Sequence, residues 1–240
     1  MKIAAVCVTY LRPRQLGWMI RCFELQDYTD RELVVLDDAG QYESQEGDRW
    51  KLISIKRRFR SLGAKRNAAV RYVSADVEAL AVWDDDDLYL PWALSASVAA
   101  LTVATWSRPS VVLHPQADGS LTQHKTGGLF HGGWAYRRGL FEGIGGYPAM
   151  NNGEDQAFAR RLQQAEATEA DPCALGFLPF YVYTWGDGWA PTPHLSSMGR
   201  DGYRRLRRVV PEKTKLEITA PPWFDPLDPR IIPGVNKRMF

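Results

Sequence analysis

The sequence predicts an α/β protein in which helices connect the strands of a mostly parallel sheet. Short apolar runs of small and β-branched residues recur through the first hundred residues, which is typical of strands buried on both faces. Segments with helical spacing of apolar residues lie between these runs, so each connection is a crossover. Several of the runs end abruptly in polar residues, and one of them ends in four consecutive aspartates.

The elements of the first half are expected to alternate in a regular order. Strands are expected at residues 3–9, 33–36, 52–55 and 79–82. Helices are expected at residues 14–26, 63–73 and 92–105. In the first helix, Leu16, Met19, Ile20 and Phe23 recur at the spacing of one helix face. Pro91 suits the start of the third helix, because proline at the first turn gives up no helical hydrogen bond.

The character of the chain changes after about residue 105. Short strands are expected at 111–114 and 121–130, and a glycine-rich stretch with tight turns follows them. A helix is expected from Glu154 onward, then an aromatic, strand-like segment at 177–185 and a basic helix at 203–210. These changes predict two halves of one domain, 1–108 and 109–200. They also predict that 201–240, a basic helix and proline-rich tail, packs on the body.

The bulk composition is that of a globular protein, with 45% hydrophobic and 24% charged residues. The net charge is only +2, but basic runs occur at 56–60 and 200–208, which form either solvated faces or grips for phosphate. Three cysteines without CxxC spacing favour a reducing compartment over a disulfide framework or zinc site. No signal peptide or membrane-length apolar run is apparent, so we expect a cytoplasmic location.

The four aspartates at 84–87 follow the strand at 79–82. Such crowding is unfavourable unless a positive charge relieves the repulsion. A hard divalent cation such as Mg²⁺ or Mn²⁺ does so, and these ions commonly bridge one or two carboxylates to the phosphates of a substrate. The alternative is a solvated acidic turn in which one aspartate caps the next helix. The stretch alone leaves both interpretations open.

Polar residues also end the first two strands, at Thr9 and Tyr10 and at Asp37 and Asp38. The carboxyl ends of parallel strands lie on one edge of a sheet, which is where α/β proteins bind ligands. Asp37 or Asp38 could accept hydrogen bonds from a base or from ribose hydroxyls, and Tyr10 could stack on a base. Each residue also has a simple structural explanation, and we favour it for Tyr10 more than for Asp38.

Arg66 falls in the first turn of the helix expected at 63–73, where its guanidinium could face a diphosphate. The neighbouring Lys65 is more simply explained by a structural role. Glu154 and Asp155 fall in the first turn of a later helix, where the helix dipole keeps a carboxylate ionised. They either cap that helix or accept a proton from an incoming hydroxyl. His194 is either a third metal ligand or a structural histidine.

Five motifs, in this order, resemble those of the family 2 inverting glycosyltransferases, and they cover about residues 3–165. They are Val6-Cys7-Val8-Thr9-Tyr10-Leu11-Arg12-Pro13, residues 33–38 with paired aspartates, Gly63-Ala64-Lys65-Arg66-Asn67, residues 83–91 as the DxD motif, and Gly143-Ile144-Gly145-Gly146-Tyr147 with Glu154-Asp155. The resemblance implies the GT-A fold, a Rossmann-like nucleotide-binding sheet with a smaller acceptor-side subdomain. Residues 1–108 would then bind the donor, and 109–200 would bind the acceptor and carry out catalysis.

The resemblance also implies a role for each candidate residue. The cofactor would be Mn²⁺ or Mg²⁺, and the donor a nucleoside diphosphate sugar, with a UDP-sugar expected. The catalytic base would be Asp155, with Glu154 as the second choice. The implied binding residues are Thr9, Tyr10, Asp38, Arg66, Asp84 and Asp85 for the donor, and Asp86, Asp84 and His194 for the metal.

Two other functions compete with this interpretation. A nucleotidyltransferase also uses a parallel sheet, a metal and carboxylates, but it would need a glycine-rich loop after the first strand, and residues 10–14 contain no glycine. A non-catalytic protein that binds a nucleotide sugar or nucleic acid is the second rival. The acceptor stays open between a glycan, a lipid-linked sugar, a protein, a small molecule and a modified nucleic acid. The basic runs are compatible with the last of these.

Overall fold

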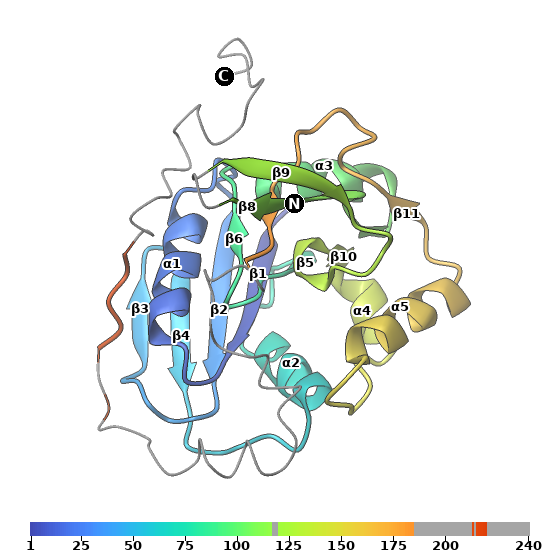
Figure 1. Ribbon diagram of the computed structural model, residues 1–240. Helices are drawn as coiled ribbons and strands as arrows, with labels where there is room; N and C mark the ends of the chain where they lie inside the picture. The colour runs from blue at the N-terminus through green and yellow to red at the C-terminus, as the bar shows by residue number, and fades with distance from the viewer. Residues whose placement is uncertain (117–119, 185–212, 214, 220–240) are drawn as a thin grey trace.

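The computed structural model describes residues 1–116, 120–184, 213 and 215–219 (Figure 1). Its main feature is an eight-stranded sheet in the order β11-β7-β10-β5-β1-β2-β4-β3. The strands are β1 (Ile3–Thr9), β2 (Arg31–Asp37), β3 (Gln45–Gly47), β4 (Trp50–Ser54), β5 (Ala79–Val82), β7 (Trp106–Ser107), β10 (Ala135–Arg137) and β11 (Glu169–Ala170). The four strands predicted for the first half are therefore confirmed as β1, β2, β4 and β5.

The centre of this sheet is parallel, because β5, β1, β2 and β4 run side by side in one direction. In the register, Thr9 at the end of β1 lies opposite Asp37 at the end of β2, and Val6 lies opposite Val82 at the end of β5. Three polar strand ends therefore meet at one edge, as the sequence predicted. Beyond β5 the sheet becomes mixed, since β10 is antiparallel to both β5 and β7.

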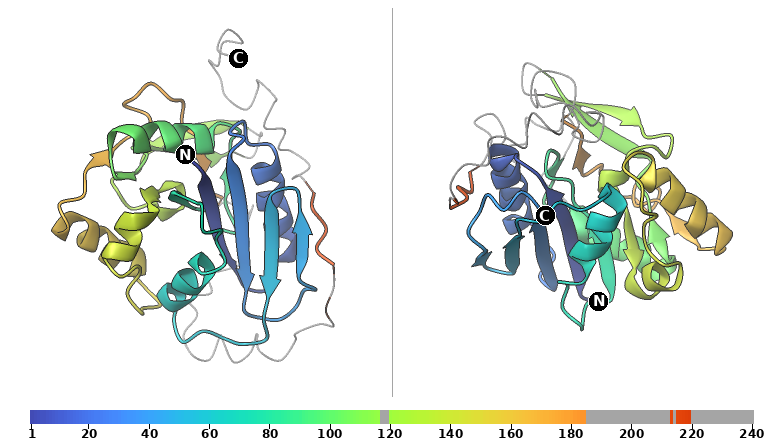
Figure 2. Two further views of the ribbon diagram at one scale, coloured as in Figure 1. Left: turned by 180° about the vertical axis from the view of Figure 1, so that it is seen from behind. Right: turned by 90° about the horizontal axis from the view of Figure 1, so that it is seen from below.

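Helices cover both faces of the sheet (Figures 1 and 2). They are α1 (Pro13–Glu24), α2 (Leu62–Val70), α3 (Ala93–Val103), α4 (Arg138–Gly143) and α5 (Glu154–Gln164), with a short 3₁₀ turn, η1 (His131–Gly133). Alternate residues of β1 enter two separate cores. Ala5 packs with apolar side chains of α1 and α3, whereas Val6 packs with those of α2, α4 and α5.

A second, smaller sheet has the order β6-β12-β8-β9. Its strands are β6 (Leu88–Tyr89), β8 (Val111–Pro115), β9 (Leu121–Lys125) and β12 (Tyr181–Val182). The strand expected at 121–130 ends at Lys125, because a turn follows at residues 127–128, where both glycines have positive φ. Of the aromatic segment expected at 177–185, which the structure describes up to residue 184, only Tyr181 and Val182 form a strand. Tyr181 there pairs with Tyr89, directly after the aspartates.

Residues 185–189, His194 and the basic helix expected at 203–210 lie outside the described residues. Of the C-terminal part that is described, Leu216 is buried in the core that contains α1. Gly17 of α1 lies so close to this segment that a Cβ atom there would be 2.3 Å from the Glu217 carbonyl oxygen. Among the described residues, no helix has both the length and the apolar character needed to cross a bilayer.

Candidate active site

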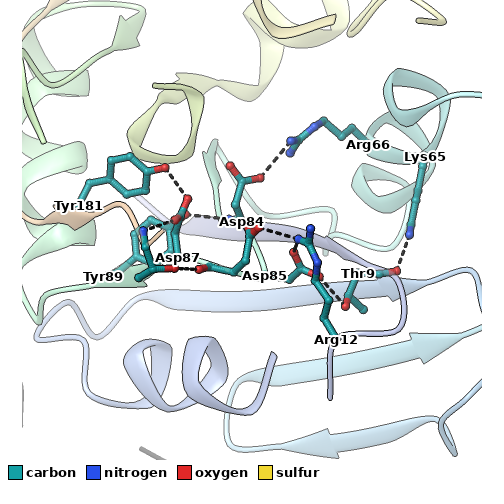
Figure 3. Close-up of polar contacts among 11 residues, drawn as sticks. Thr9, Arg12, Lys65, Arg66, Asp84, Asp85, Asp87, Tyr89 and Tyr181 are labelled. Carbon is teal, nitrogen blue, oxygen red and sulfur yellow. Dashed lines mark hydrogen bonds and ion pairs between the residues drawn. The ribbon is translucent and has the colours of Figure 1, made fainter. Parts of the chain in front are cut away.

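The carboxyl ends of β1, β2 and β5 bring the predicted polar residues together in one site (Figure 3). The Thr9 hydroxyl donates a hydrogen bond to Asp85, with 2.8 Å between the oxygens. The Lys65 ammonium, from α2, donates to the Thr9 carbonyl and, at 2.6 Å, to the Asp38 carboxylate. Lys65 is therefore part of the site, a role that the sequence favoured less than a structural one.

Arg12 is the main residue of the site that the sequence analysis did not select. Its Nη1 atom lies 2.8 Å from Asp85 Oδ1 and 2.7 Å from Asp86 Oδ2, and all three side chains are buried. Burial lowers the pKa of Arg12, but the charges of Asp85 and Asp86 outweigh it, so the pKa is raised. The preceding Leu11 has a φ of 55°, a left-handed conformation at the turn from β1 into α1.

Arg66 connects two other carboxylates. It donates a hydrogen bond to Asp84 Oδ1 at 3.0 Å, and its Nε atom lies 3.6 Å from Glu154 Oε1. Helix α2 presents this side chain because Ser61 caps its first turn, accepting a hydrogen bond from the Ala64 amide. Although burial lowers the pKa of Arg66, its charged neighbours raise it, and Arg66 stays a cation. An ion pair therefore connects α2 with α5, in addition to the apolar core that they share.

The fourth aspartate, Asp87, has a structural role. Its carboxylate accepts hydrogen bonds from the Tyr181 hydroxyl and from the Thr184 amide, the latter at 3.0 Å. Burial raises the pKa of Asp87 well above its usual range, and the charges of Asp86 and Asp84 add to the effect. Asp87 thereby attaches the segment that follows β12 to the end of β5, whereas Asp84, Asp85 and Asp86 pair with Arg66 and Arg12.

The paired aspartates after β2 also differ in role. Asp37 is fully buried, and its carboxylate accepts hydrogen bonds from the amides of residues 39–41 and from the Ser54 hydroxyl. Asp38 instead faces the site, where it accepts from Lys65, Arg58 and the Phe59 amide. Of the two aspartates, Asp38 is therefore the one that lines the cavity.

Arg58 covers the ring of Tyr10, with its Cζ atom 3.7 Å from the ring centroid, while it pairs with Asp38. This arginine belongs to the basic run at 56–60, which the sequence analysis interpreted only as a solvated face or a phosphate grip. The structure thus shows that one member of the run stacks on an aromatic ring inside the site. Tyr10 itself is buried, with 7% of its surface exposed.

Two adjoining cavities open at this edge of the sheet. The first is lined by Thr9, Tyr10, Arg12, Asp38, Arg58, Lys65 and their neighbours, and also by Asn151. The second, of about 470 Å³, is lined by Phe130, His131, Glu154, Asp155, Tyr181, Tyr183 and their neighbours. Arg66, Asp84 and Asp86 line both cavities. A ligand that fills the first cavity would therefore meet a ligand in the second beside these three side chains.

Helix α5 places two carboxylates in the second cavity, both in its first turn as the sequence predicted. Glu154 is 5% exposed, and burial raises its pKa despite the nearby Arg66 charge. Asp155 is more exposed, and its Oδ1 accepts a hydrogen bond from the Gln156 amide at 2.8 Å. Within the described part of the chain, Glu154 has an ion-pair partner and Asp155 has none.

His131 of η1 also lines the second cavity. Its Nε2 atom lies 2.8 Å from the Tyr147 hydroxyl, which is 2.9 Å from the Tyr136 hydroxyl. Burial lowers the pKa of His131 well below its usual value, and the Arg66 charge adds to this effect, so the imidazole is neutral. Nothing in the sequence around His131 distinguished it, because its partner Tyr147 lies 16 residues further along the chain.

Comparison with known proteins shows the class of fold. No family model matches the sequence, and no curated protein matches it. Solved structures of glycosyltransferases with the GT-A fold do match, with TM-scores near 0.55 and identities below 20%. The predicted fold class is thereby confirmed: the chain has an α/β fold with a mixed, largely parallel sheet, like that of GT-A glycosyltransferases.

Two of the matches are to TarS from S. aureus and to a mannosyltransferase from Pyrobaculum calidifontis. TarS residues 1–349 in complex with UDP-GlcNAc match with a TM-score of 0.55 and 18% identity over 86% of this chain and 65% of that one. The mannosyltransferase PcManGT in complex with GDP-Man and Mn²⁺ matches with a TM-score of 0.56 and 18% identity over 86% and 60%. This chain thus spans less than two thirds of the length of either match.

Proposed function

We propose that this protein is a metal-dependent inverting glycosyltransferase that moves a sugar from a nucleoside diphosphate sugar to a hydroxyl acceptor. The observation that carries the proposal is the meeting of two cavities at Arg66, Asp84 and Asp86. A sugar transferred between two substrates has to lie at such a junction. The complexes of the fold relatives with UDP-GlcNAc and with GDP-Man support a nucleotide sugar as the donor.

The donor nucleotide is assigned to the first cavity, which is lined by residues of 1–108 and by Asn151. Asp38, which lines this cavity with Thr9 and Tyr10, would accept hydrogen bonds from the base or ribose. Lys65 and Arg66 place cationic groups along the same cavity, where they would attract the diphosphate. We expect a UDP-sugar. A base would compete with Arg58, which contacts both Asp38 and Tyr10.

The chemistry of the carboxylates fits a hard divalent cation. Asp84 and Asp86 both line the junction of the cavities, and one or two carboxylates suffice for Mg²⁺ or Mn²⁺ when substrate phosphates supply further oxygens. Among the described residues, no group of three or more His, Cys, Asp or Glu side chains is arranged to hold a metal by itself. When bound, the cation would neutralise charge on the leaving diphosphate. We therefore assign it to Asp86 and Asp84; the third ligand proposed, His194, lies outside the described residues.

Asp155 is assigned as the general base. It lines the second cavity and is more exposed than Glu154, whose carboxylate is paired with Arg66. In a direct displacement, the acceptor oxygen attacks the anomeric carbon, its proton passes to Asp155, and the bond to the diphosphate oxygen breaks. Arg66 would stabilise the charge that develops on the departing diphosphate. Glu154 stays the second choice of base.

The first test is a set of thermal melts with UDP, GDP, CDP and TDP, each with and without Mn²⁺. A ligand that binds only the folded protein raises its melting temperature. We expect one nucleotide to stabilise the protein in a metal-dependent way, and this shift to vanish in Asp86→Ala. Incubation with the matching nucleotide sugars and NMR of the product then reports the anomeric configuration. If the protein binds a nucleotide but turns over no nucleotide sugar, it is a non-catalytic binding protein. A product that retains the anomeric configuration of the donor would exclude the inverting mechanism.

A further inference from the structure

The Asp38 carboxylate, which lines the first cavity, is paired with two cations. Its Oδ1 atom accepts hydrogen bonds from the Lys65 ammonium, at 2.6 Å, and from the Arg58 guanidinium. Its Oδ2 atom accepts a hydrogen bond from the Phe59 amide at 3.1 Å. Burial lowers the pKa of Lys65, and the charge of Arg58 adds to this effect, so the two cations repel each other. Asp38 would therefore keep a cationic partner if either of them moved away.

Of these two cations, Arg58 is the one that can move away. The Lys65 side chain is 5% exposed and also donates to the Thr9 carbonyl, and a buried charge that loses its partner is strongly destabilising. The Arg58 side chain is 27% exposed, so its guanidinium can reach water by rotation about its own bonds. The hydrogen bond between the Phe59 amide and Asp38 can meanwhile hold the backbone of this loop in place.

Arg58 also covers one face of the Tyr10 ring. Its Cζ atom lies 3.7 Å from the ring centroid. Carbon atoms make van der Waals contact at about 3.5–4.0 Å, so no planar group fits between the guanidinium and the ring. The guanidinium is itself planar, it stacks on Tyr10, and its N–H group donates to Asp38. These are the two contacts that we expect for the donor base, so the guanidinium and the base are alternatives at one position.

The charges favour an exchange of this kind. The guanidinium is a cation, whereas a nucleotide base is neutral. When a base replaces Arg58, Asp38 and Lys65 stay behind as a balanced pair, and an N–H group of the base takes over the hydrogen bond to Asp38. What is lost is a partly exposed ion pair and a cation–π contact, which together correspond to about tenfold in affinity.

We propose that Arg58 is an internal competitor of the donor. Its guanidinium holds the position of the base on Tyr10 and Asp38, and a nucleotide binds when its base displaces the guanidinium. The apparent affinity of a ligand falls with the fraction of protein that can accept it, so Arg58 sets the affinity of the first cavity for the donor. This inference rests on the proposed function and deepens it, because it concerns control of the same site.

The test is calorimetric titration of the whole protein with UDP, GDP, CDP and TDP in the presence of Mn²⁺. Arg58→Ala removes the guanidinium, and Arg57→Ala is the matched control. Arg57 belongs to the same basic run, but it is exposed and is not among the residues that line either cavity. Both variants lose one positive charge near the diphosphate, so a comparison between them cancels this general attraction.

We expect Arg58→Ala to bind its preferred nucleotide about tenfold more tightly than Arg57→Ala does. Arg58→Gln, a neutral polar side chain, is a second variant that should also bind more tightly than the control. Thermal melts without nucleotide show whether each variant is folded. If the folded Arg58 variants bind every nucleotide equally to Arg57→Ala or more weakly, Arg58 does not compete with the base, and the proposal is overturned.

Donor consumption, measured separately, distinguishes this inference from the proposed function. A gain in nucleotide affinity in the Arg58 variants, in a protein that turns over no nucleotide sugar, would support the competitor and remove the transferase. Turnover by the wild type without a gain in affinity in these variants would keep the transferase and overturn the competitor. If neither the wild type nor any variant binds one of the four nucleotides, both proposals are wrong.

Discussion

The Arg12 guanidinium lies between Asp85 and Asp86, 2.8 Å and 2.7 Å from their carboxylate oxygens. Asp86 is also one of the two residues to which we assign the metal. In the described structure, Arg12 relieves the repulsion among the clustered carboxylates, which is the task that a divalent cation would perform. Arg12 and the cation are therefore expected to compete for the same negative charge, and this competition can be measured.

Replacing Arg12 by glutamine is expected to make the protein less stable but more responsive to Mn²⁺. Removal of one partner of a buried ion pair costs about 3–5 kcal/mol, because the remaining charges are left uncompensated. Added Mn²⁺ should restore part of this loss, so the metal-induced rise in melting temperature should be larger in the variant than in the wild type. Thermal melts with and without Mn²⁺, in the absence of nucleotide, measure both effects.

Arg108→Gln is the matched control for the Arg12 variant. Arg108 also pairs with a carboxylate, that of Glu169 at 3.0 Å, but this pair is partly exposed and lies outside the two carboxylate-lined cavities. Exposed ion pairs contribute about 0–1 kcal/mol, so this variant should melt close to the wild type and respond equally to Mn²⁺. If Mn²⁺ stabilised all three proteins to the same extent, Arg12 would have no influence on the metal.

Substitution of the two carboxylates of α5 is expected to separate their roles. Asp155→Asn should lower kcat by about 10²- to 10⁴-fold, the range that general base catalysis contributes, and should leave the nucleotide-induced melting shift intact. Glu154→Gln should cost less activity, since that carboxylate is paired with Arg66. Donor consumption at saturating substrate measures kcat. The opposite order of effects would identify Glu154 as the base.

The pH dependence of stability is expected to report on Glu154. Burial raises the pKa of Glu154 in the folded protein above its ordinary value of 4.5, despite the Arg66 charge. The folded state then holds this proton more tightly than the unfolded state does. Glu154 therefore favours folding most at low pH, and this contribution is lost as the pH rises from the unfolded-state pKa through the raised folded-state pKa.

A comparison with Glu154→Gln isolates this contribution. Melting temperatures of the wild type and the variant, measured without metal from below pH 4.5 to neutrality, give the difference at each pH. We expect the wild type to lose stability relative to Glu154→Gln as the pH increases across this window. A constant difference would mean that the Glu154 pKa is the same in the folded and unfolded protein.

Gly63→Ala is expected to destabilise the protein, because α2 approaches the loop before α5 closely at this residue. A Cβ at Gly63 would lie 1.9 Å from the Pro148 carbonyl oxygen, and the Gly63 amide donates to the Met150 carbonyl at 3.0 Å. Overpacking of this kind costs about 1–3 kcal/mol. Denaturant unfolding measures the loss. Gly139→Ala in α4, where a Cβ meets no atom within 4 Å, should be neutral or slightly stabilising.

The sequence by itself determined the parts of this protein that depend on local pattern. Strands of a parallel sheet are buried on both faces and are therefore apolar throughout. The apolar runs at β1, β2 and β5 thus predict such a sheet directly. Their polar ends had to meet, because parallel strands place their carboxyl ends on one edge. The helical spacing after residue 154 likewise placed Glu154 and Asp155 in a first turn. The short strands β7, β10 and β11 were not predicted, since two or three residues carry no periodicity and depend on their neighbours for pairing.

Only the tertiary structure decided which residue in each cluster of polar residues lines a cavity and which has a structural role. Asp37 and Asp38 are adjacent and chemically identical. Asp37 nevertheless accepts hydrogen bonds from the amides of a turn, whereas Asp38 faces a cavity. Among the four consecutive aspartates, Asp87 anchors the end of β12 while Asp84 and Asp86 line the junction of the cavities. Arg12 could not be selected from the sequence, because its partner Asp85 is 73 residues away. Such roles depend on contacts between distant segments and on burial, which exist only once the chain has packed.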